Sequence, residues 1–268
     1  MTTDAMTTLA STIGDSRTML RRNLKHAVRY PVLTLMVAGI PIVLLLLFVY
    51  VFGGTLGAGL GGVSGGRAEY ADFLTPGMLV LAIASAAQGT AITVAMDMNE
   101  GIIARFRTMS IARASVLTGH VVGAVVQTMI GLAFVVAVAL LIGFRPDAGA
   151  LEWLAVAGVL VLVSFALSWL SVAMGLAATS VEGASNLPMP LVLLPFLGSG
   201  FVPTESMPAG LRWFAEYQPF TPMIDTLRGL LTGSAIGSSA VQAVAWCAVI
   251  ALAGYLWARA SYERRPAR

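Results

Sequence analysis

Residue types that carry acid–base, metal or nucleophilic chemistry are scarce in this sequence. The histidines, His26 and His120, are far apart along the chain, and the single cysteine, Cys247, lies in an apolar stretch. A membrane metalloprotease needs a motif such as His-Glu-x-x-His, and a serine hydrolase needs a serine with a base beside it; neither pattern is recognisable here. We therefore predict no catalytic site, no metal site and no disulfide within the chain, and we do not expect an enzyme.

A glycine-rich stretch could be mistaken for a phosphate-binding loop. Eight glycines fall between Gly53 and Gly66. A Walker loop, however, needs a lysine followed by serine or threonine, and the only lysine of this chain is Lys25, which precedes a histidine. We predict that the chain binds no ATP or other cofactor of its own, and that the glycines form a flexible loop.

The charged stretch 97–113 is the candidate for binding another protein. Asp97 or Asn99 could cap a short helix, and that helix would present an apolar knob with basic flanks. Such a knob suits docking into the groove of a partner. The alternative is a solvated positive loop that only fixes the orientation of the chain in a membrane. The apolar residues of the knob are Ile102, Ile103 and Phe106.

Composition indicates that the elements around this stretch lie in a membrane. The 268 residues are 57% hydrophobic and 11% charged, whereas a soluble domain carries about 25% charged residues. Several stretches without Asp, Glu, Lys or Arg exceed the roughly 20 residues that a helix needs to cross a bilayer. Because lipid satisfies no backbone polar group, such long runs must be helices, whereas a barrel would show short alternating strands. The predicted fold class is an all-α membrane protein.

The expected organisation is an N-terminal segment, a transmembrane domain with six transmembrane helices and a short tail. These three parts cover residues 1–30, 31–258 and 259–268. The fifth span contains Pro188, Pro190 and Pro195, so we expect it to begin irregularly or to bend, either as simple kinked packing or as a moving gate. The spans are expected at about 31–52, 73–96, 116–142, 153–178, 187–202 and 237–258.

Basic residues predict the orientation. An even number of spans places both termini on one side, and 12 of the 16 basic residues then share that side, among them Arg105, Arg107 and Arg113 of the second connecting loop. The positive-inside rule makes this side cytoplasmic. We expect a multi-pass protein of the plasma membrane with cytoplasmic termini, and no nucleic-acid partner, because topology explains the basic pI.

The N-terminal segment 1–30 has an amphipathic pattern. Its apolar residues fall on one side of a helical wheel and its basic residues on the adjoining flank. This predicts an interfacial helix against anionic lipid headgroups or a partner. The alternative is a solvated basic tail that only sets topology.

Residues 203–235 are too polar to span a membrane but are rich in helix signals. Ser206 with Pro208 can start one short helix, and Thr221 can start another that Gly233 closes. We predict two short re-entrant helices that dip into the outer leaflet. Their candidate residues are Trp213 and Tyr217, as interfacial aromatics, and Asp225 with Arg228, three apart and able to form an ion pair.

The polar residues within the predicted spans are uncharged. Carboxylates fall at span ends or in loops, so no proton relay is apparent and the energy for any transport must come from elsewhere. The candidates to line a pathway for an amphipathic substrate are Ser85, Gln88 and Thr93 of the second span. Ordinary helix packing is the alternative reading, since small and hydroxyl residues let helices approach closely.

The charged loop resembles a loop in the membrane subunits of type-2 ABC exporters. In that family Glu and Gly are followed by an Arg and then by Pro-x-x-Arg. Glu100, Gly101, Arg105 and Arg113 match, whereas Ser110 stands where proline is usual. Two further regions agree, 70–77 before the second span and 201–230 after the fifth, and the latter is most similar to the daunorubicin-resistance branch.

The resemblance implies a permease that pairs with a second copy and with two separate ATP-binding subunits, which would carry ATP and magnesium. The expected cargo is hydrophobic drugs, lipids or glycoconjugates, and export as the direction rests on the resemblance alone. The loop from Glu100 to Arg113 would be the coupling helix, with Phe106 as its anchor and Arg105 and Arg107 as its polar rim. The helices within 204–232 would cap the outer exit.

Two other functions compete with this interpretation. A membrane scaffold or assembly factor could use the same loop to dock a partner while nothing crosses the membrane. A passive channel is disfavoured because the outer loops lack rings of charge and the spans lack a polar stripe.

Overall fold

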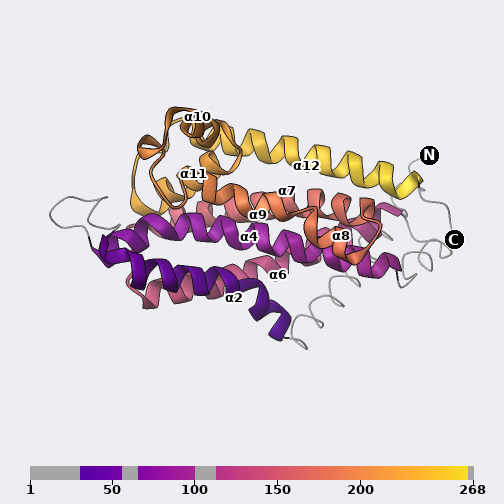
Figure 1. The fold of residues 1–268 in the computed structure, drawn as a ribbon, viewed down its shortest axis with the longest axis horizontal. Helices are drawn as coiled ribbons and strands as arrows, with labels where there is room; N and C mark the ends of the chain where they lie inside the picture. The colour runs from indigo at the N-terminus through magenta and orange to yellow at the C-terminus, as the bar shows by residue number, and fades with distance from the viewer. Residues whose placement is uncertain (1–30, 56–65, 100–112, 265–268) are drawn as a thin grey trace.

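The computed structural model describes residues 31–55, 66–99 and 113–264, and these residues form a helical bundle without β-strands (Figure 1). The long helices lie side by side along the bundle. Short helices connect α7 to α12. The long elements are α2 (Pro31–Leu47), extended by a π-helix at Phe48–Phe52, α4 (Arg67–Asn99), α6 (Arg113–Leu141), α7 (Ala150–Ala177) and α12 (Ser239–Arg264).

Five helices in the described ranges are long and apolar enough to cross a membrane, by length and composition. The prediction of an all-α membrane fold is confirmed at this level. Helices of this kind are the expected form, because each satisfies its own backbone hydrogen bonds where no water is present. Their apolar stretches are Ala38–Thr55, Arg67–Asn99, Leu117–Leu141, Ala150–Ala177 and Ser239–Tyr262.

The helix α4 is longer at both ends than the predicted span 73–96. It continues through Asp97 to Asn99. The predicted role of Asp97 as the cap of a helix in the following loop is therefore wrong, because Asp97 lies inside α4. Its carboxylate instead lies 3.4 Å from Nε2 of His120 on α6.

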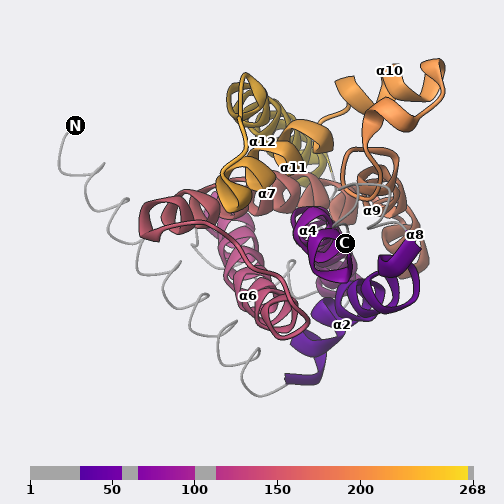
Figure 2. The same cartoon turned by 90° about the vertical axis from the view of Figure 1, so that its left-hand side faces the viewer.

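The centre of the bundle is made by α4 and α7, which pack closely where they cross. A Cβ placed on Gly175 of α7 would lie 2.5 Å from the carbonyl oxygen of Ala91 on α4. Glycine is therefore required at this crossing, because any side chain would push the two backbones apart. Figure 2 shows α4 enclosed by α2, α6, α7 and the short helices, and α12 lies on the far side of α7.

The outer surface of the bundle is apolar along much of its length. Large side chains stay exposed on the peripheral helices, for example Ile40 and Val43 on α2 and Val241 and Leu252 on α12. Contiguous exposed apolar surface of this extent suits a lipid environment rather than water.

The two ends of the bundle carry different structures (Figure 1). We call the end with α10 (Ala209–Tyr217) and α11 (Phe220–Thr232) the hairpin end. The opposite end, where α4 ends, α6 begins and α8 (Val181–Asn186) lies, is called the α8 end. The α12 helix starts at the hairpin end and finishes at the α8 end.

The region of the fifth predicted span, 187–202, overlaps an apolar segment made of short helices. The chain forms α8, then α9 (Met189–Leu193), then a 3-10 helix η3 (Leu194–Leu197), and this apolar segment is shorter than the long helices. We call residues 181–197 the broken segment. The predicted irregularity is confirmed, because Pro188 stands at the break and provides no N–H to continue α8.

The two short helices predicted within 203–235 are present as α10 and α11. Their starts were predicted slightly wrong. Pro208 and Pro219 stand at the N-caps of α10 and α11, while the hydroxyls of Ser206 and Thr221 donate to backbone carbonyls and cap neither helix. Gly233 closes α11 as predicted, with a left-handed φ of 69° that favours glycine.

Candidate functional site

A tight turn at Gly198, Ser199 and Gly200 brings the end of the broken segment against α4 and α11. The backbones of Gly77 on α4 and Gly200 are in direct contact: a Cβ on Gly77 would lie 2.6 Å from the carbonyl oxygen of Gly200. Because neither residue has a side chain, the turn can approach α4 closely. This approach places Ser199 beside the polar face of α11.

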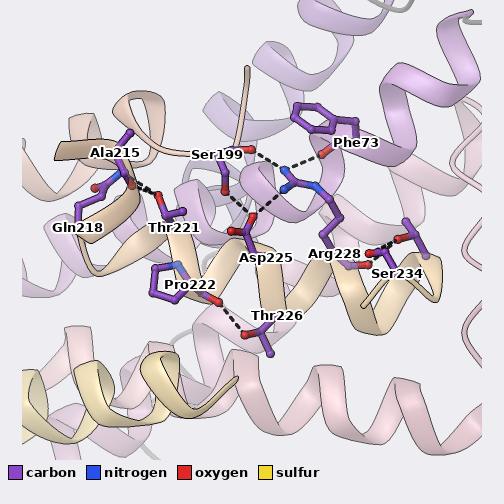
Figure 3. A network of polar contacts seen from close by, with 11 residues as sticks. Phe73, Ser199, Ala215, Gln218, Thr221, Pro222, Asp225, Thr226, Arg228 and Ser234 are labelled. Atoms are coloured by element: carbon purple, nitrogen blue, oxygen red, sulfur yellow. Dashed lines mark hydrogen bonds and ion pairs between the residues drawn. The ribbon is translucent and has the colours of Figure 1, made fainter. Parts of the chain in front are cut away.

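Arg228 of α11 joins three segments at this point (Figure 3). Its Nη1 donates to Oδ1 of Asp225 at 2.7 Å, and its Nη2 donates to the carbonyl oxygens of Ser199 and Phe73. The guanidinium also lies over the ring of Phe73, 4.2 Å from its centroid. The predicted ion pair between Asp225 and Arg228 is confirmed, and it is the centre of a wider network.

Ser199 completes the network from the other side. Its hydroxyl donates to Oδ1 of Asp225 at 2.6 Å, so the carboxylate accepts from both Ser199 and Arg228. The side chain of Arg228 is 17% exposed and that of Asp225 35% exposed. Hydrogen bonds to charged groups are stronger than neutral ones, and partial burial strengthens them further.

Burial of Arg228 has an electrostatic consequence. Desolvation lowers the pKa of the Arg228 guanidinium, and the neighbouring carboxylate of Asp225 raises it in opposition. Arginine stays charged at neutral pH despite such a shift. Its Nε is buried and has no hydrogen-bond partner among the described residues. The guanidinium is therefore held by Asp225, two carbonyls and one aromatic face.

A second polar cluster holds the corner between α10 and α11. The amide of Gln218 donates to the carbonyl of Leu194 at 3.1 Å, and the hydroxyl of Thr221 donates to the carbonyl of Ala215. Gln218 and Thr221 also fill the space beside Gly198. The two clusters together attach the helical hairpin to the broken segment at one point and to α4 at another.

The α10 helix is the most exposed part of the hairpin end. Trp213 and Tyr217 are 65% and 66% exposed, with ring centroids 5.5 Å apart. Arg212 and Glu216 form an exposed ion pair at 2.7 Å. An exposed aromatic pair beside a charged pair is the composition expected at a membrane–water interface.

The predicted pathway residues on α4 have different surroundings. Ser85 and Thr93 donate to carbonyls of their own helix, those of Leu81 and Gly89. Gln88 instead donates from Nε2 to the carbonyl of Ser185 on α8, at 2.7 Å. Thr93 is exposed, whereas Ser85 and Gln88 are half-buried. The three residues lie along one helix, and of the three only Gln88 donates a hydrogen bond to another segment in the described part of the chain.

Most of the predicted coupling residues lie outside the described residues. Glu100, Gly101, Arg105, Phe106 and Arg107 belong to this part of the chain, and Arg113 is the first residue of α6. The helices on either side of this loop are braced by the contact between Asp97 and His120. The coupling role of the loop thus stays a prediction.

Among the described residues, no group of three or more His, Cys, Asp or Glu side chains lies close enough together to hold a metal ion. The hairpin-end network is built from a salt bridge, an arginine on an aromatic ring and backbone acceptors. Such groups hold elements together and can separate and re-form.

Two members of the network, Phe73 and Ser199, were missed at the level of sequence. Phe73 lies at the start of α4, 155 residues from Arg228, and nothing in the spacing of the sequence links them. The glycines on either side of Ser199 were the available signal, since paired glycines often mark a close approach of two backbones.

These features define a multi-pass helical membrane protein whose polar contacts at the hairpin end link helices that are distant in sequence. Comparison with known proteins gives the family: residues 15–232 match the ABC-2 type transporter model, and the chain belongs to this family. One relative is the daunorubicin resistance ABC transporter permease protein DrrB1 of Streptomyces coeruleorubidus. It is 30% identical over 228 residues, which cover 84% of this chain and 78% of the relative.

A second relative is the probable doxorubicin resistance ABC transporter permease protein DrrC of Mycobacterium tuberculosis. It is 25% identical over 177 residues, covering 64% of this chain and 63% of the relative. The resemblance that we drew from the loop and the two flanking regions is confirmed by the family match and by the first relative.

Proposed function

We propose that this chain is the membrane permease subunit of an ATP-driven exporter. The observation that carries the proposal is the match of residues 15–232 to the ABC-2 type transporter family, together with 30% identity to a daunorubicin resistance permease over most of the chain. The sequence has no Walker motif, since its only lysine is Lys25. ATP and magnesium would then be bound by a separate subunit.

The proposed topology has six membrane crossings, of which the broken segment is the fifth. Residues 181–197 would extend about 26 Å if fully α-helical, which is close to the thickness of the hydrocarbon core. In Figure 1 this segment runs along the bundle from α8 towards the hairpin end, which supports a crossing. The α8 end would be cytoplasmic, together with both termini, because most basic residues fall on that side.

The proposed partners are two copies of an ABC ATP-binding subunit and a second permease copy, in the surrounding lipid. The family normally works with an ATP-binding subunit, and the charged loop 100–113 follows directly from α4 at the α8 end. We assign Glu100, Gly101, Arg105, Phe106, Arg107 and Arg113 to contact with that subunit.

The proposed cargo is a hydrophobic drug or a lipid, with a glycoconjugate as the alternative. The names of the two relatives refer to daunorubicin and doxorubicin resistance, which are properties of those proteins. Ser85 and Thr93 offer hydroxyl groups on α4 to such a substrate, whereas the amide of Gln88 donates to the carbonyl of Ser185 on α8. The hairpin α10–α11 would close the outer exit, held in place by Arg228 and Asp225.

Co-purification tests the subunit assignment. The chain is expressed with an ABC ATP-binding subunit encoded beside it, extracted in detergent, and assayed for ATP hydrolysis with and without a hydrophobic drug. We expect a stable complex whose hydrolysis changes on addition of drug or lipid. If the folded chain binds no ATPase, the permease proposal fails and a membrane scaffold becomes the better account.

A further inference from the structure

The break between α8 and α9 leaves backbone acceptors that the helix itself does not satisfy. Because α8 ends at Asn186, before Pro188, the carbonyl of Ser185 is one of the last four of this helix, which have no donor within it. Unsatisfied backbone groups are costly away from water, and a discontinuous segment at membrane depth persists only where neighbours supply partners. The neighbour on this side of the break is α4.

The α8 side of the break is packed directly on the end of α4. Ala184 is completely buried and forms a small cluster with Ala95 of α4 and Ala178, which precedes α8. The hydroxyl of Ser180 accepts from the backbone N–H of Gly183 at 3.0 Å and caps the start of α8. These small residues hold α8 close to α4 without large interlocking side chains, so the contact can separate without repacking bulky groups.

Gln88 provides a hydrogen bond across this contact between α4 and α8, which we call the joint. Its Nε2 donates to the carbonyl oxygen of Ser185 at 2.7 Å, linking positions 97 residues apart. The hydroxyls of Thr90 and Thr93, close to it on α4, donate only within α4, to carbonyls four residues earlier. Gln88 therefore reaches another segment, whereas these neighbours do not.

We propose that Gln88 is a positioning residue for transport, whose amide holds the α8 side of the broken segment against α4 and makes the break at Pro188 a hinge. This inference rests on the proposed function and deepens it. It assigns Gln88 to the contact between two moving parts rather than to contact with the cargo.

The position of this contact in the bundle suits such a role. Gln88 lies 11 residues before Asn99, where α4 ends, which is about 16 Å of helix. Beyond Asn99 is the loop proposed to receive the ATP-binding subunit. Beyond the break, α9 and η3 lead to the turn at Ser199 and so to Arg228. A displacement of α4 at the α8 end is thus passed to the hairpin end through the broken segment.

The test compares Gln88→Met, which keeps side-chain length but cannot donate, with Thr90→Val, a matched control on the same helix. Each variant is assembled with its ATP-binding subunit, and ATP-driven export and backbone hydrogen exchange over residues 183–191 are both measured. For Gln88→Met we expect export at least threefold lower and exchange about threefold faster, as for loss of one interhelical hydrogen bond of about 0.6 kcal/mol. Thr90→Val should change neither.

Four outcomes are distinguishable. Faster exchange together with lower export in Gln88→Met supports the inference. Lower export with unchanged exchange contradicts it and makes Gln88 a cargo contact. Normal export contradicts it as well, whatever the exchange. If the wild-type complex exports nothing while exchange accelerates in Gln88→Met, the joint stands and the proposed function is the part that fails.

Discussion

The guanidinium of Arg228 lies 4.2 Å from the centroid of the Phe73 ring and donates to the carbonyl of the same residue. This relationship ties the middle of α11 to the first turns of α4, the central helix of the bundle. Arginine suits the position because its planar group can stack on a ring while its fork of donors reaches carbonyls and a carboxylate. The hairpin is therefore held at a defined place on α4.

Replacement of Arg228 should loosen the hairpin end. Arg228→Ala removes the ion pair to Asp225 and the stacking on Phe73, and we expect a loss of about 2–3 kcal/mol of stability. In thermal denaturation of the purified protein this corresponds to a midpoint lower by roughly 5 °C or more. Arg228→Lys should fall between, because it keeps the charge but loses the fork.

Arg212→Ala is the matched control for Arg228. Arg212 pairs with Glu216 at the same distance of 2.7 Å, but these side chains are 47% and 41% exposed. Exposed pairs contribute about 0–1 kcal/mol, so the midpoint should hardly move. Equal effects of Arg228→Ala and Arg212→Ala would show that the network around Phe73 is unimportant.

Ser199 and Asp225 should act as a coupled pair. Ser199→Ala removes a hydrogen bond of 2.6 Å to the carboxylate, which should cost about 1 kcal/mol. Because Asp225→Asn weakens the same contact, the double variant should be less destabilised than the sum of the two single variants. A strictly additive result in a double-mutant cycle would mean that the two side chains do not interact.

Two glycines of α4 should respond in opposite directions to the same change. Gly77→Ala places a methyl group 2.6 Å from the Gly200 carbonyl oxygen, and such overpacking costs about 1–3 kcal/mol. Nothing lies within 4 Å of a Cβ on Gly89, so Gly89→Ala should be neutral or stabilising by up to about 1 kcal/mol. Thermal denaturation of both variants decides, and a stable Gly77→Ala would argue against the close approach of the turn.

Phe106 is predicted to anchor the ATP-binding subunit. Phe106→Ala should leave insertion into the membrane intact but uncouple ATP hydrolysis from export, reducing drug-stimulated hydrolysis by about tenfold or more, as expected for loss of a buried aromatic anchor. Phe106→Leu keeps an apolar side chain and should retain most of the coupling. Normal export by Phe106→Ala would remove the anchor role from this residue.

Much of the fold could be predicted from the sequence, for a physical reason. Long stretches without charge can only be helices in lipid, so the five long apolar helices follow from composition. The helix of Phe220–Thr232 and its ion pair between Asp225 and Arg228 also follow, because a spacing of three places both side chains on one face. Local rules suffice for such features.

Contacts between segments could not be predicted in this way. Phe73 contacts Arg228, and Gln88 contacts Ser185, only when the helices pack together. The spacing of residues in a single sequence does not specify which helices pack against each other. The start of the short apolar helices at Val181, where Ser180 caps α8, also went unrecognised in the sequence.

Reconstituted transport tests the central claim most directly. The chain and its ATP-binding subunit are placed together in liposomes, and uptake of daunorubicin, followed by its fluorescence, is measured with ATP and magnesium. Liposomes with a hydrolysis-deficient ATP-binding subunit serve as the control. The account predicts accumulation of drug, or of a fluorescent lipid, that requires both subunits and ATP hydrolysis. Flux that is equal without ATP would indicate a passive channel, and absence of flux for drug, lipid and glycoconjugate alike would contradict the exporter assignment.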